Sequence, residues 1–183
     1  MGRHSWDVTQ LCIGSHGGID WMGAPVTAAV RFLRSHRITY TEHLYNYEER
    51  GGTAVSSREL GVSEHAVVKT LIMQTDDGKP LVILMHGDRK VSTKGLARLI
   101  GAKSIKPCDV KLATKHSGYA VGGTSPFGTR KVMPVYIEKS IFNLSKIYIN
   151  GGARGFLVSV SPHVFVDVLI VFDDVFPTRG VRH

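Results

Sequence analysis

The chain has 183 residues, of which 43% are hydrophobic and 21% charged, a composition typical of one compact domain with a full apolar core. Its 23 lysines and arginines exceed its 15 aspartates and glutamates, which gives a formal net charge of +8. The two cysteines, Cys12 and Cys108, fit no zinc-ligand spacing and predict no disulfide framework. Because no apolar run is long enough to cross a bilayer and no secretory signal is recognisable, we expect a cytoplasmic protein with no membrane partner.

The positive charge is concentrated in one stretch of the sequence. Between Arg89 and Lys131 there are ten lysines and arginines but a single acid, Asp109. Such a basic stretch is typical of proteins that bind a polyanion, most often a nucleic acid. A solvated basic surface would have the same composition, so the charge by itself does not decide between the two.

Periodicity and turn residues predict one folded domain over residues 25–170, preceded by a loose arm (1–24) and followed by a tail (171–183). The elements predicted in chain order are a helix over 25–38, a strand over 38–45, a helix over 54–61, a helix starting at Ser63, strands over 69–75 and 80–87, helices over 92–102 and 106–118, strands over 132–140, 145–150 and 156–161, and a helix over 161–169.

The connections between these elements indicate the fold class. The Asp77-Gly78 pair joins two apolar strands and is a hairpin signal, which requires antiparallel pairing. Helices are interspersed among the strands. The sequence therefore predicts a mixed α/β, α+β-like single domain with a mainly antiparallel mixed sheet flanked by helices.

The stretch SGYAVGGTSPFGTRK, residues 117–131, contains four glycines and is called the glycine loop below. Gly123 and Gly128 have the spacing of a phosphate-binding P-loop. However, Thr129 and Arg130 follow where that motif requires Lys and then Ser or Thr, and a strand follows where a helix is required. The loop is therefore not expected to bind a nucleoside triphosphate.

Other hydrolase motifs do not account for the sequence either. It contains no H-E-x-x-H metal motif and no G-x-S-x-G nucleophile motif. Lys69 interrupts an otherwise apolar strand, so its side chain either extends from the strand to water or projects into a cleft. Periodicity alone favours the extension to water.

Three segments together resemble one family: VVKTLIM (67–73), GYAVGGTSPFGTRKVMPVYIE (118–138) and IYINGGARG (147–155). In order and spacing they are similar to the YbaK/EbsC family of free-standing aminoacyl-tRNA deacylases, which is related to the editing domain of bacterial prolyl-tRNA synthetases. The resemblance extends over about residues 25–169. It implies that fold, and hydrolysis of the ester in tRNA that carries a wrong amino acid. Cysteine on the tRNA for proline is the first expected substrate and alanine the second.

The resemblance also assigns roles to particular residues. It implies catalytic roles for Lys69, as a point charge that binds the terminal phosphate or holds the ester, and for Gly122 and Gly123, whose backbone N–H groups would approach the ester carbonyl. It implies substrate-binding roles for Tyr45, Thr124, Ser125, Pro126, Asn150 and Gly151. An aminoacyl ester is already activated, so no protein nucleophile, metal or cofactor is expected.

Three positions depart from the family pattern near the expected side-chain pocket. Asn150 stands where the cysteine deacylases have a serine, Leu157 where they have an acid, and Thr124 where an aliphatic residue is usual. The amino acid that is removed is therefore left open. Two other interpretations stay open as well: a non-catalytic tRNA- or RNA-binding module, and a synthetase-associated adaptor. The expected partners are the acceptor end of tRNA and, by analogy with the family, a prolyl- or cysteinyl-tRNA synthetase.

Overall fold

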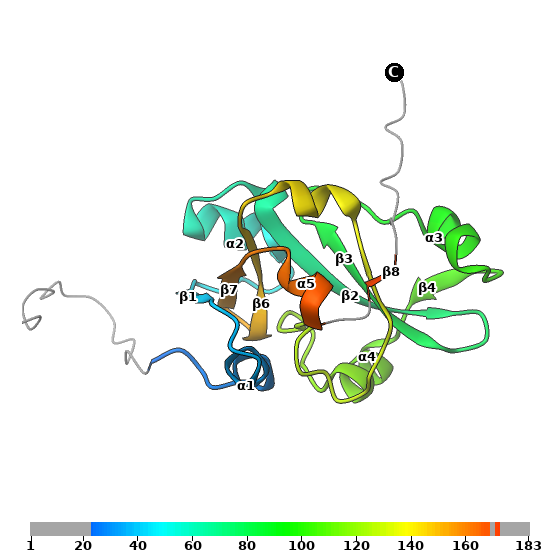
Figure 1. Cartoon of the computed structure of the whole chain (residues 1–183), viewed down its shortest axis with the longest axis horizontal. Coiled ribbons are helices and arrows are strands. Elements are labelled where there is room, and N and C mark those ends of the chain that lie inside the picture. The colour runs from blue at the N-terminus through cyan, green and yellow to red at the C-terminus, as the bar shows by residue number, and fades with distance from the viewer. Residues whose placement is uncertain (1–22, 169–170, 173–183) are drawn as a thin grey trace, which may run out of the picture.

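An eight-stranded mixed sheet organises the computed structural model, in which residues 23–168 and 171–172 are described (Figure 1). The strands are β1 (Thr41–Leu44), β2 (Val67–Thr75), β3 (Pro80–His86), β4 (Ile105–Pro107), β5 (Val135–Ile137), β6 (Ile147–Ala153), β7 (Phe156–Val160) and β8 (Val171–Phe172). Their order is β1-β7-β6-β2-β3-β5-β8, with β4 paired to β2. Four pairings are antiparallel and three are parallel, which confirms the predicted mixed, mainly antiparallel sheet.

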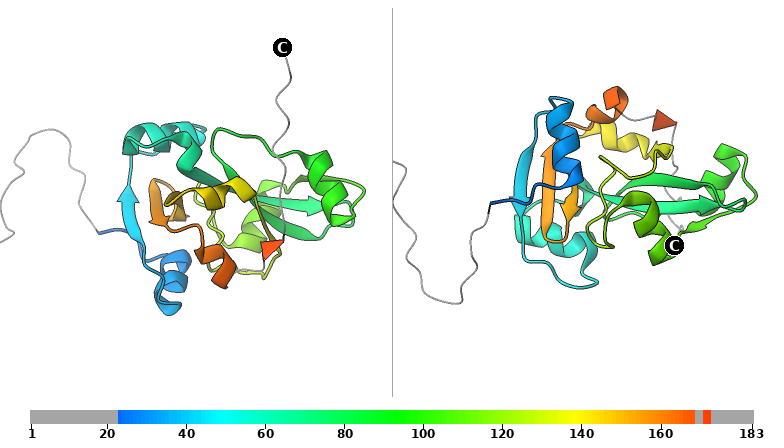
Figure 2. Two further views of the ribbon diagram at one scale, coloured as in Figure 1. Left: turned by 45° about the horizontal axis from the view of Figure 1, so that its top comes forward. Right: turned by 90° about the horizontal axis from the view of Figure 1, so that it is seen from below.

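Helices pack against this sheet, and the sheet separates the apolar core into two clusters. They are α1 (Ala28–Ser35), α2 (Gly52–Leu60), α3 (Thr93–Ile100), α4 (Val110–Ser117) and α5 (Val164–Val168), with 3₁₀ turns η1 (Glu64–Ala66) and η2 (Lys139–Asn143). The β3 side chains alternate between two apolar clusters, one that includes α1 and one that includes α3. In Figures 1 and 2, α1 and α3 lie at opposite ends of the molecule. Strand β3 is therefore buried on both faces and forms the rigid centre of the domain.

Several predicted element boundaries are confirmed by their hydrogen bonds. The Ser92 hydroxyl accepts from Gly95 N at 3.2 Å and caps α3, and Gly101 ends that helix in the left-handed conformation. The Asp77-Gly78 hairpin joins β2 and β3 as expected. These signals are local, so the sequence contains all the information that they need.

Other boundaries differ from the prediction, each for an identifiable reason. The helix expected at Ser63 is only the η1 turn, because the β-branched residues that follow continue into β2. The helix expected over 106–118 starts after Asp109, whose carboxylate accepts from Leu112 N at 2.8 Å, while 105–107 pair with β2 as β4. The helix expected from Pro25 starts instead after Thr27, which caps α1.

The ends of the predicted domain lie at the limits of the described residues. Most of the expected arm (1–24) and of the expected tail (171–183) falls outside them. Val171 and Phe172, placed in the tail by the sequence, form β8 and pair with β5. No helix in the described part of the chain is long and apolar enough to span a membrane.

Candidate functional site

The site begins at a gap along one edge of β2. On this edge β2 pairs with β6 at residues 67–68 and with β4 at residues 73–75. Between them, residues 69–72 have no strand partner on this edge within the described sheet. Only the end of the gap is closed, where the Cys108 N–H donates to the Ile72 carbonyl at 3.1 Å. The sheet therefore leaves backbone polar groups unpaired in its interior as well as at its edge strands.

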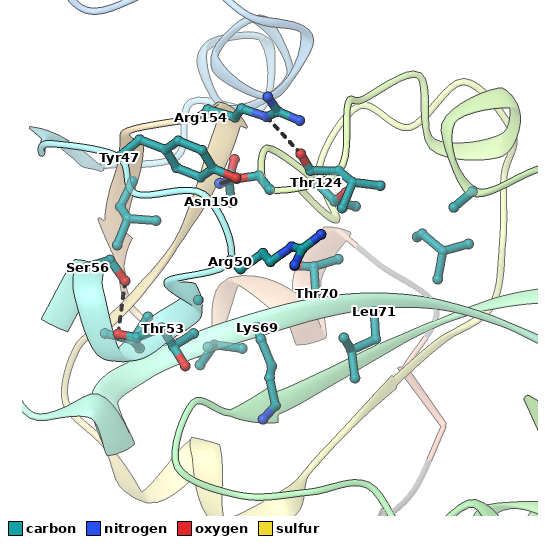
Figure 3. Close-up of a pocket in the computed structure, with 18 of the residues that line it drawn as sticks. Tyr47, Arg50, Thr53, Ser56, Lys69, Thr70, Leu71, Thr124, Asn150 and Arg154 are labelled. Carbon is teal, nitrogen blue, oxygen red and sulfur yellow. Dashed lines mark hydrogen bonds between the residues drawn. The ribbon is translucent and has the colours of Figure 1, made fainter. Parts of the chain in front are cut away.

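A cavity of about 770 Å³ opens over this gap (Figure 3). Its walls come from β2, the segment from β1 into α2, the start of α4, the glycine loop and the turn between β6 and β7. This volume is within the range of pockets that bind small molecules. The residues of all three sequence segments that carry the family resemblance meet here, although they are far apart in the chain.

The structure divides the expected site residues into two groups. Five of them line the cavity: Tyr45, Lys69, Gly122, Thr124 and Asn150. The other four are buried and do not line it: Gly123, Ser125, Pro126 and Gly151. Their positions in the sequence are right for the loop and the strand, but their side chains or α-carbons face the protein interior.

Gly122 has the geometry of a residue that only glycine can occupy. Its φ is +87°, and a Cβ there would lie 2.6 Å from the Tyr47 hydroxyl oxygen. Its N–H has no hydrogen-bond partner among the described residues, so it is free to donate to a ligand. By contrast, the Gly123 N–H donates to the Ala120 carbonyl at 2.9 Å. The expected pair of free amides is therefore reduced to one, that of Gly122.

Two side chains from β6 and its turn hold the glycine loop in place. Asn150 donates from Nδ2 to the Gly122 carbonyl at 3.0 Å and accepts from the Gly152 N–H at 2.8 Å. Arg154 donates from Nε to the Val121 carbonyl at 2.9 Å. Asn150 lines the cavity, but its amide is engaged with the backbone on both sides. Its main contribution in this structure is to fix the position of Gly122.

Lys69 is directed away from the cavity mouth. Its ammonium group donates to the Gly87 carbonyl at 3.0 Å and to the Arg89 carbonyl. Figure 3 shows the side chain leaving β2 on the side opposite Thr70. The pKa of this ammonium group is lowered, mainly by burial, and the nearby Glu64 and Asp88 carboxylates offset only part of that effect. The lysine thus holds the loop after β3, and its ammonium group does not point into the cavity.

Thr70 presents polar groups to the gap that no other residue satisfies. Its hydroxyl is buried without a hydrogen-bond partner among the described residues. The backbone groups of alternate strand residues point to the same edge, so the Thr70 N–H and C=O face the gap as the Ile72 carbonyl does. Such unpaired buried polar groups are costly unless a ligand or water satisfies them.

The remaining polar side chains of the cavity come from the loop that leads into α2. Tyr45 and Tyr47 are half-buried, and burial raises the pKa of the Tyr45 hydroxyl. Arg50 has a left-handed backbone, with φ of +62°, and its side chain crosses the cavity between Tyr47 and Thr70 (Figure 3). Sequence reasoning assigned no role to Tyr47, Arg50, Thr70 or Arg154. Thr70 and Arg154 lie inside the motifs that carry the resemblance, whereas nothing in the sequence marks Arg50.

Potential nucleophiles and bases are few at the cavity. Its lining includes no histidine, and burial raises the pKa of the Cys108 thiol, which favours its protonated form. The Ser56 hydroxyl donates to the Thr53 carbonyl at 3.1 Å. No group of three or more His, Cys, Asp or Glu side chains in residues 23–168 and 171–172 could hold a metal ion.

A second polar group of residues lies beyond Lys69, and we call His65, His86, Asp88, Glu138 and Ser140 the histidine cluster. The two imidazole rings stack with centroids 3.7 Å apart. His65 Nδ1 is 3.1 Å from the Asp88 carboxylate, and the His86 Nδ1–H donates to the His65 carbonyl at 2.6 Å. His86 Nε2 is 2.9 Å from the Ser140 hydroxyl, which is 3.1 Å from Glu138 Oε1. None of the five lines the cavity.

Comparison with known proteins identifies the family of the chain. A family model described as the aminoacyl-tRNA editing domain covers residues 49–168. EbsC of Enterococcus faecalis, named as a candidate Cys-tRNA(Pro)/Cys-tRNA(Cys) deacylase, is 28% identical over 143 residues, which are 78% of this chain and 87% of EbsC. The proline–tRNA ligase of Thermodesulfovibrio yellowstonii is 31% identical over 115 residues, which are 62% of this chain and 19% of the ligase.

Solved structures show the same fold. One named as a candidate trans-editing enzyme for prolyl tRNA synthetase superposes with a TM-score of 0.70 and covers 86% of this chain and 100% of its own. At 18% identity this similarity establishes the architecture and leaves the chemistry to the residues of the site.

Proposed function

The chain belongs to the family of aminoacyl-tRNA editing domains, and on this premise we propose that it is a trans-editing deacylase, which hydrolyses the ester between a wrong amino acid and the 3′ end of tRNA. The observation that carries the proposal is the meeting of three distant segments on one cavity. Lys69 and Thr70, Gly122 and Thr124, and Asn150 and Arg154 all line it. The cavity is large enough to take an aminoacyl group together with the terminal ribose.

The proposed reaction relies on orientation and on hydrogen bonds to the developing negative charge. Water adds to the ester carbonyl carbon, and the Gly122 N–H and the Thr70 hydroxyl donate to the oxygen that becomes negative. The bond to the ribose oxygen then breaks, the ribose oxygen takes a proton, and the free amino acid and tRNA leave. With a cysteine substrate, its own thiol is proposed to attack the carbonyl carbon instead of water: the thiol loses its proton, the bond to the ribose oxygen breaks, that oxygen takes up a proton, and a thiolactone and tRNA leave. Both routes use an ester that is already activated, which is consistent with a lining without histidine.

The substrate side chain is proposed to lie against the apolar part of the lining. Leu157 is only 4% exposed, and Ile72 and Val68 are also buried at this wall. Small apolar or thiol side chains fit such a wall better than charged ones do. We therefore place cysteine first and alanine second among the proposed substrates, both on the tRNA for proline. A prolyl- or cysteinyl-tRNA synthetase is the proposed protein partner.

A second candidate function is a tRNA- or RNA-binding module without turnover, either alone or as an adaptor for a synthetase. It is favoured by the position of Lys69, whose ammonium group is engaged by two carbonyls rather than presented to the cavity. A binding module would retain the basic surface and the cavity but would release no amino acid.

The decisive experiment measures deacylation of tRNA for proline charged with cysteine, alanine, serine or proline. Wild type is compared with Lys69→Ala, and with Lys79→Ala as a matched control, because Lys79 pairs with Asp77 in a turn away from the cavity. We expect cleavage of the cysteine or alanine ester that falls about 10-fold or more in Lys69→Ala and is unchanged in Lys79→Ala.

Chemical denaturation of the same variants separates catalysis from folding. Lys69→Ala leaves two carbonyls without their donor, so a loss of about 1–3 kcal/mol in the free energy of unfolding is expected. RNA binding by wild type without cleavage of any of the four esters would replace the deacylase by the binding module. Stable co-elution with a synthetase and no activity alone would identify the adaptor.

A further inference from the structure

Two arginines without anionic partners stand at the mouth of the cavity. Arg50 belongs to the loop between β1 and α2, and Arg154 to the turn between β6 and β7. Both are exposed and both line the cavity. Figure 3 shows them on the side of β2 that carries Thr70, with Tyr47 and Asn150 between them. The exposed lining thus carries these two cations and one carboxylate, that of Glu49.

Arg50 is held in an unusual conformation without an internal partner. Its left-handed backbone is rare for a residue other than glycine, asparagine or aspartate. Its guanidinium group makes no hydrogen bond or ion pair with any described residue, including the neighbouring Glu49. The adjacent Glu48 pairs with Arg58 of α2 and not with Arg50. The side chain therefore lies over the cavity with its guanidinium group available to a ligand.

Arg154 is held in place by one of its three guanidinium nitrogens, and the other two have no partner in the part of the chain that the structure describes. Its Nε donates to the Val121 carbonyl, and its guanidinium carbon lies 5.4 Å from the centre of the Tyr47 ring. Neither terminal amino group has a hydrogen-bond partner among the described residues. Those two groups remain available for an anion, and a guanidinium can bind phosphate oxygens with two parallel hydrogen bonds.

The chemistry of the substrate identifies the anion. An aminoacyl ester has no negative charge of its own, and its α-amino group is cationic or neutral. The nearest negative charge in an RNA 3′ end is the phosphodiester that precedes the terminal nucleotide. The resemblance to the deacylase family would give this phosphate to Lys69, but its ammonium group points to the Gly87 and Arg89 carbonyls instead.

We propose that Arg50 and Arg154 together bind the phosphodiester that precedes the 3′-terminal nucleotide of the RNA. The inference rests on the proposed function, because it assumes that an RNA 3′ end enters the cavity. Anchoring this phosphate at the mouth sets how deeply the terminal nucleotide enters, and so brings the ester to Gly122 and Thr70. Each arginine is a positioning residue here, since it contacts the substrate away from the reacting carbonyl.

The test neutralises the phosphate and the arginines separately. The probe is an acceptor-stem RNA hairpin that carries no amino acid and has a single-stranded 3′ end. It is made in three forms: with normal linkages, with a neutral methylphosphonate at the last linkage, and with a methylphosphonate inside the paired stem. The variants are Arg50→Asn, because asparagine tolerates the left-handed backbone, and Arg154→Gln. Arg98→Gln is the control, since Arg98 is an exposed arginine on α3 that does not line the cavity. Fluorescence anisotropy gives Kd at fixed low salt.

We expect the methylphosphonate at the last linkage to weaken binding by wild type about 10-fold, and the one in the stem about 2-fold. Arg50→Asn and Arg154→Gln should each bind the normal RNA about 5-fold more weakly and should respond to the last linkage only about 2-fold, because one arginine still contacts the phosphate. Arg98→Gln should bind the normal RNA about 2-fold more weakly, and the methylphosphonate at the last linkage should weaken its binding as much as it does in wild type.

Three results would overturn the proposal. The first is that the methylphosphonate at the last linkage weakens binding by both cavity variants as much as it weakens binding by wild type. The second is that Arg98→Gln loses as much affinity for the normal RNA as the cavity variants do. The third is that wild type does not bind the RNA at low salt. Because the probe carries no ester, the result is independent of hydrolysis. A linkage-specific effect in a protein that cleaves no ester would refute the deacylase and keep the phosphate site. Ester cleavage by a protein whose cavity variants keep the full response to the last linkage would keep the deacylase and refute the phosphate site.

Discussion

The two polar regions on either side of Lys69 are built in opposite ways. At the cavity, the Thr70 hydroxyl, the Gly122 N–H and the Arg50 guanidinium group have no partner among the described residues. In the histidine cluster most polar side-chain atoms are engaged by another, and one oxygen of Glu138 is the only buried polar atom of the five side chains without a partner among the described residues. Free polar groups indicate a place for a ligand, whereas paired ones stabilise the fold.

The difference also explains the position of Lys69 between the two regions. Its ammonium group is engaged by carbonyls of the loop that follows His86, and so it belongs to the paired side. The adjacent Thr70 belongs to the unpaired side. Since successive residues of a strand point to opposite faces, one strand serves both regions with neighbouring residues.

The largest effect is expected at Gly122, where a methyl group would collide with Tyr47 at the unpaired side. We expect Gly122→Ala to lower kcat/KM for deacylation about 100-fold, since the free amide can no longer keep its position. Gly78→Ala is a matched control: its φ is +79°, but nothing lies within 4 Å of the added Cβ. Both variants should lose about 1 kcal/mol of stability. Equal activity in the two variants would remove Gly122 from the site.

A smaller effect compares a free hydroxyl with a paired one. Thr70→Val removes a buried hydroxyl that has no partner, so stability should change by about 0.5 kcal/mol or less while kcat/KM falls about 10-fold. Thr75→Val removes a hydroxyl that accepts from the Lys79 N–H at 3.1 Å and donates to Asp77, so stability should fall by about 1–2 kcal/mol with unchanged turnover. Urea denaturation and initial rates measure both. The opposite pattern would contradict the division into free and paired groups.

The smallest effect is the pH dependence of the paired side. Burial lowers the pKa of His86, so the unfolded chain binds more protons than the folded one just below pH 6.5. The free energy of unfolding should therefore decrease as the pH falls below 6.5. Urea denaturation from pH 8 to pH 5 should show a shallower decrease in His86→Asn than in wild type. Burial also lowers the pKa of His43 and of His116, so both contribute to the slope that remains. Identical slopes in the two proteins would exclude His86.

The sequence was informative where structure depends on neighbours in the chain. The caps at Ser92 and Gly101 and the Asp77-Gly78 hairpin are as predicted, because each needs only a few adjacent residues. The family resemblance likewise selected segments that meet at one cavity. It could not tell which side chains of the glycine loop face outward, and Ser125 and Pro126 lie behind the wall.

Features that depend on distant contacts were beyond the sequence. The direction of Lys69 follows from carbonyls about 20 residues away, which no periodicity reveals. Arg50 adopts a backbone conformation that its residue type disfavours, so no propensity rule identifies it. The gap along β2 arises because β6 and β4 stop short of each other, which is a property of the whole sheet.

That gap also bears on the pairing of the sheet with strands of other chains. Unpaired strand edges are templates for intermolecular β-sheet and for aggregation. Here the open edge is only residues 69–72, and it is closed at both ends by strands of the same chain. A foreign strand cannot lie along so short and recessed an edge, whereas a small ligand can reach it. The gap therefore offers backbone groups for recognition without adding a second long open edge to the one that β1 presents at the end of the sheet.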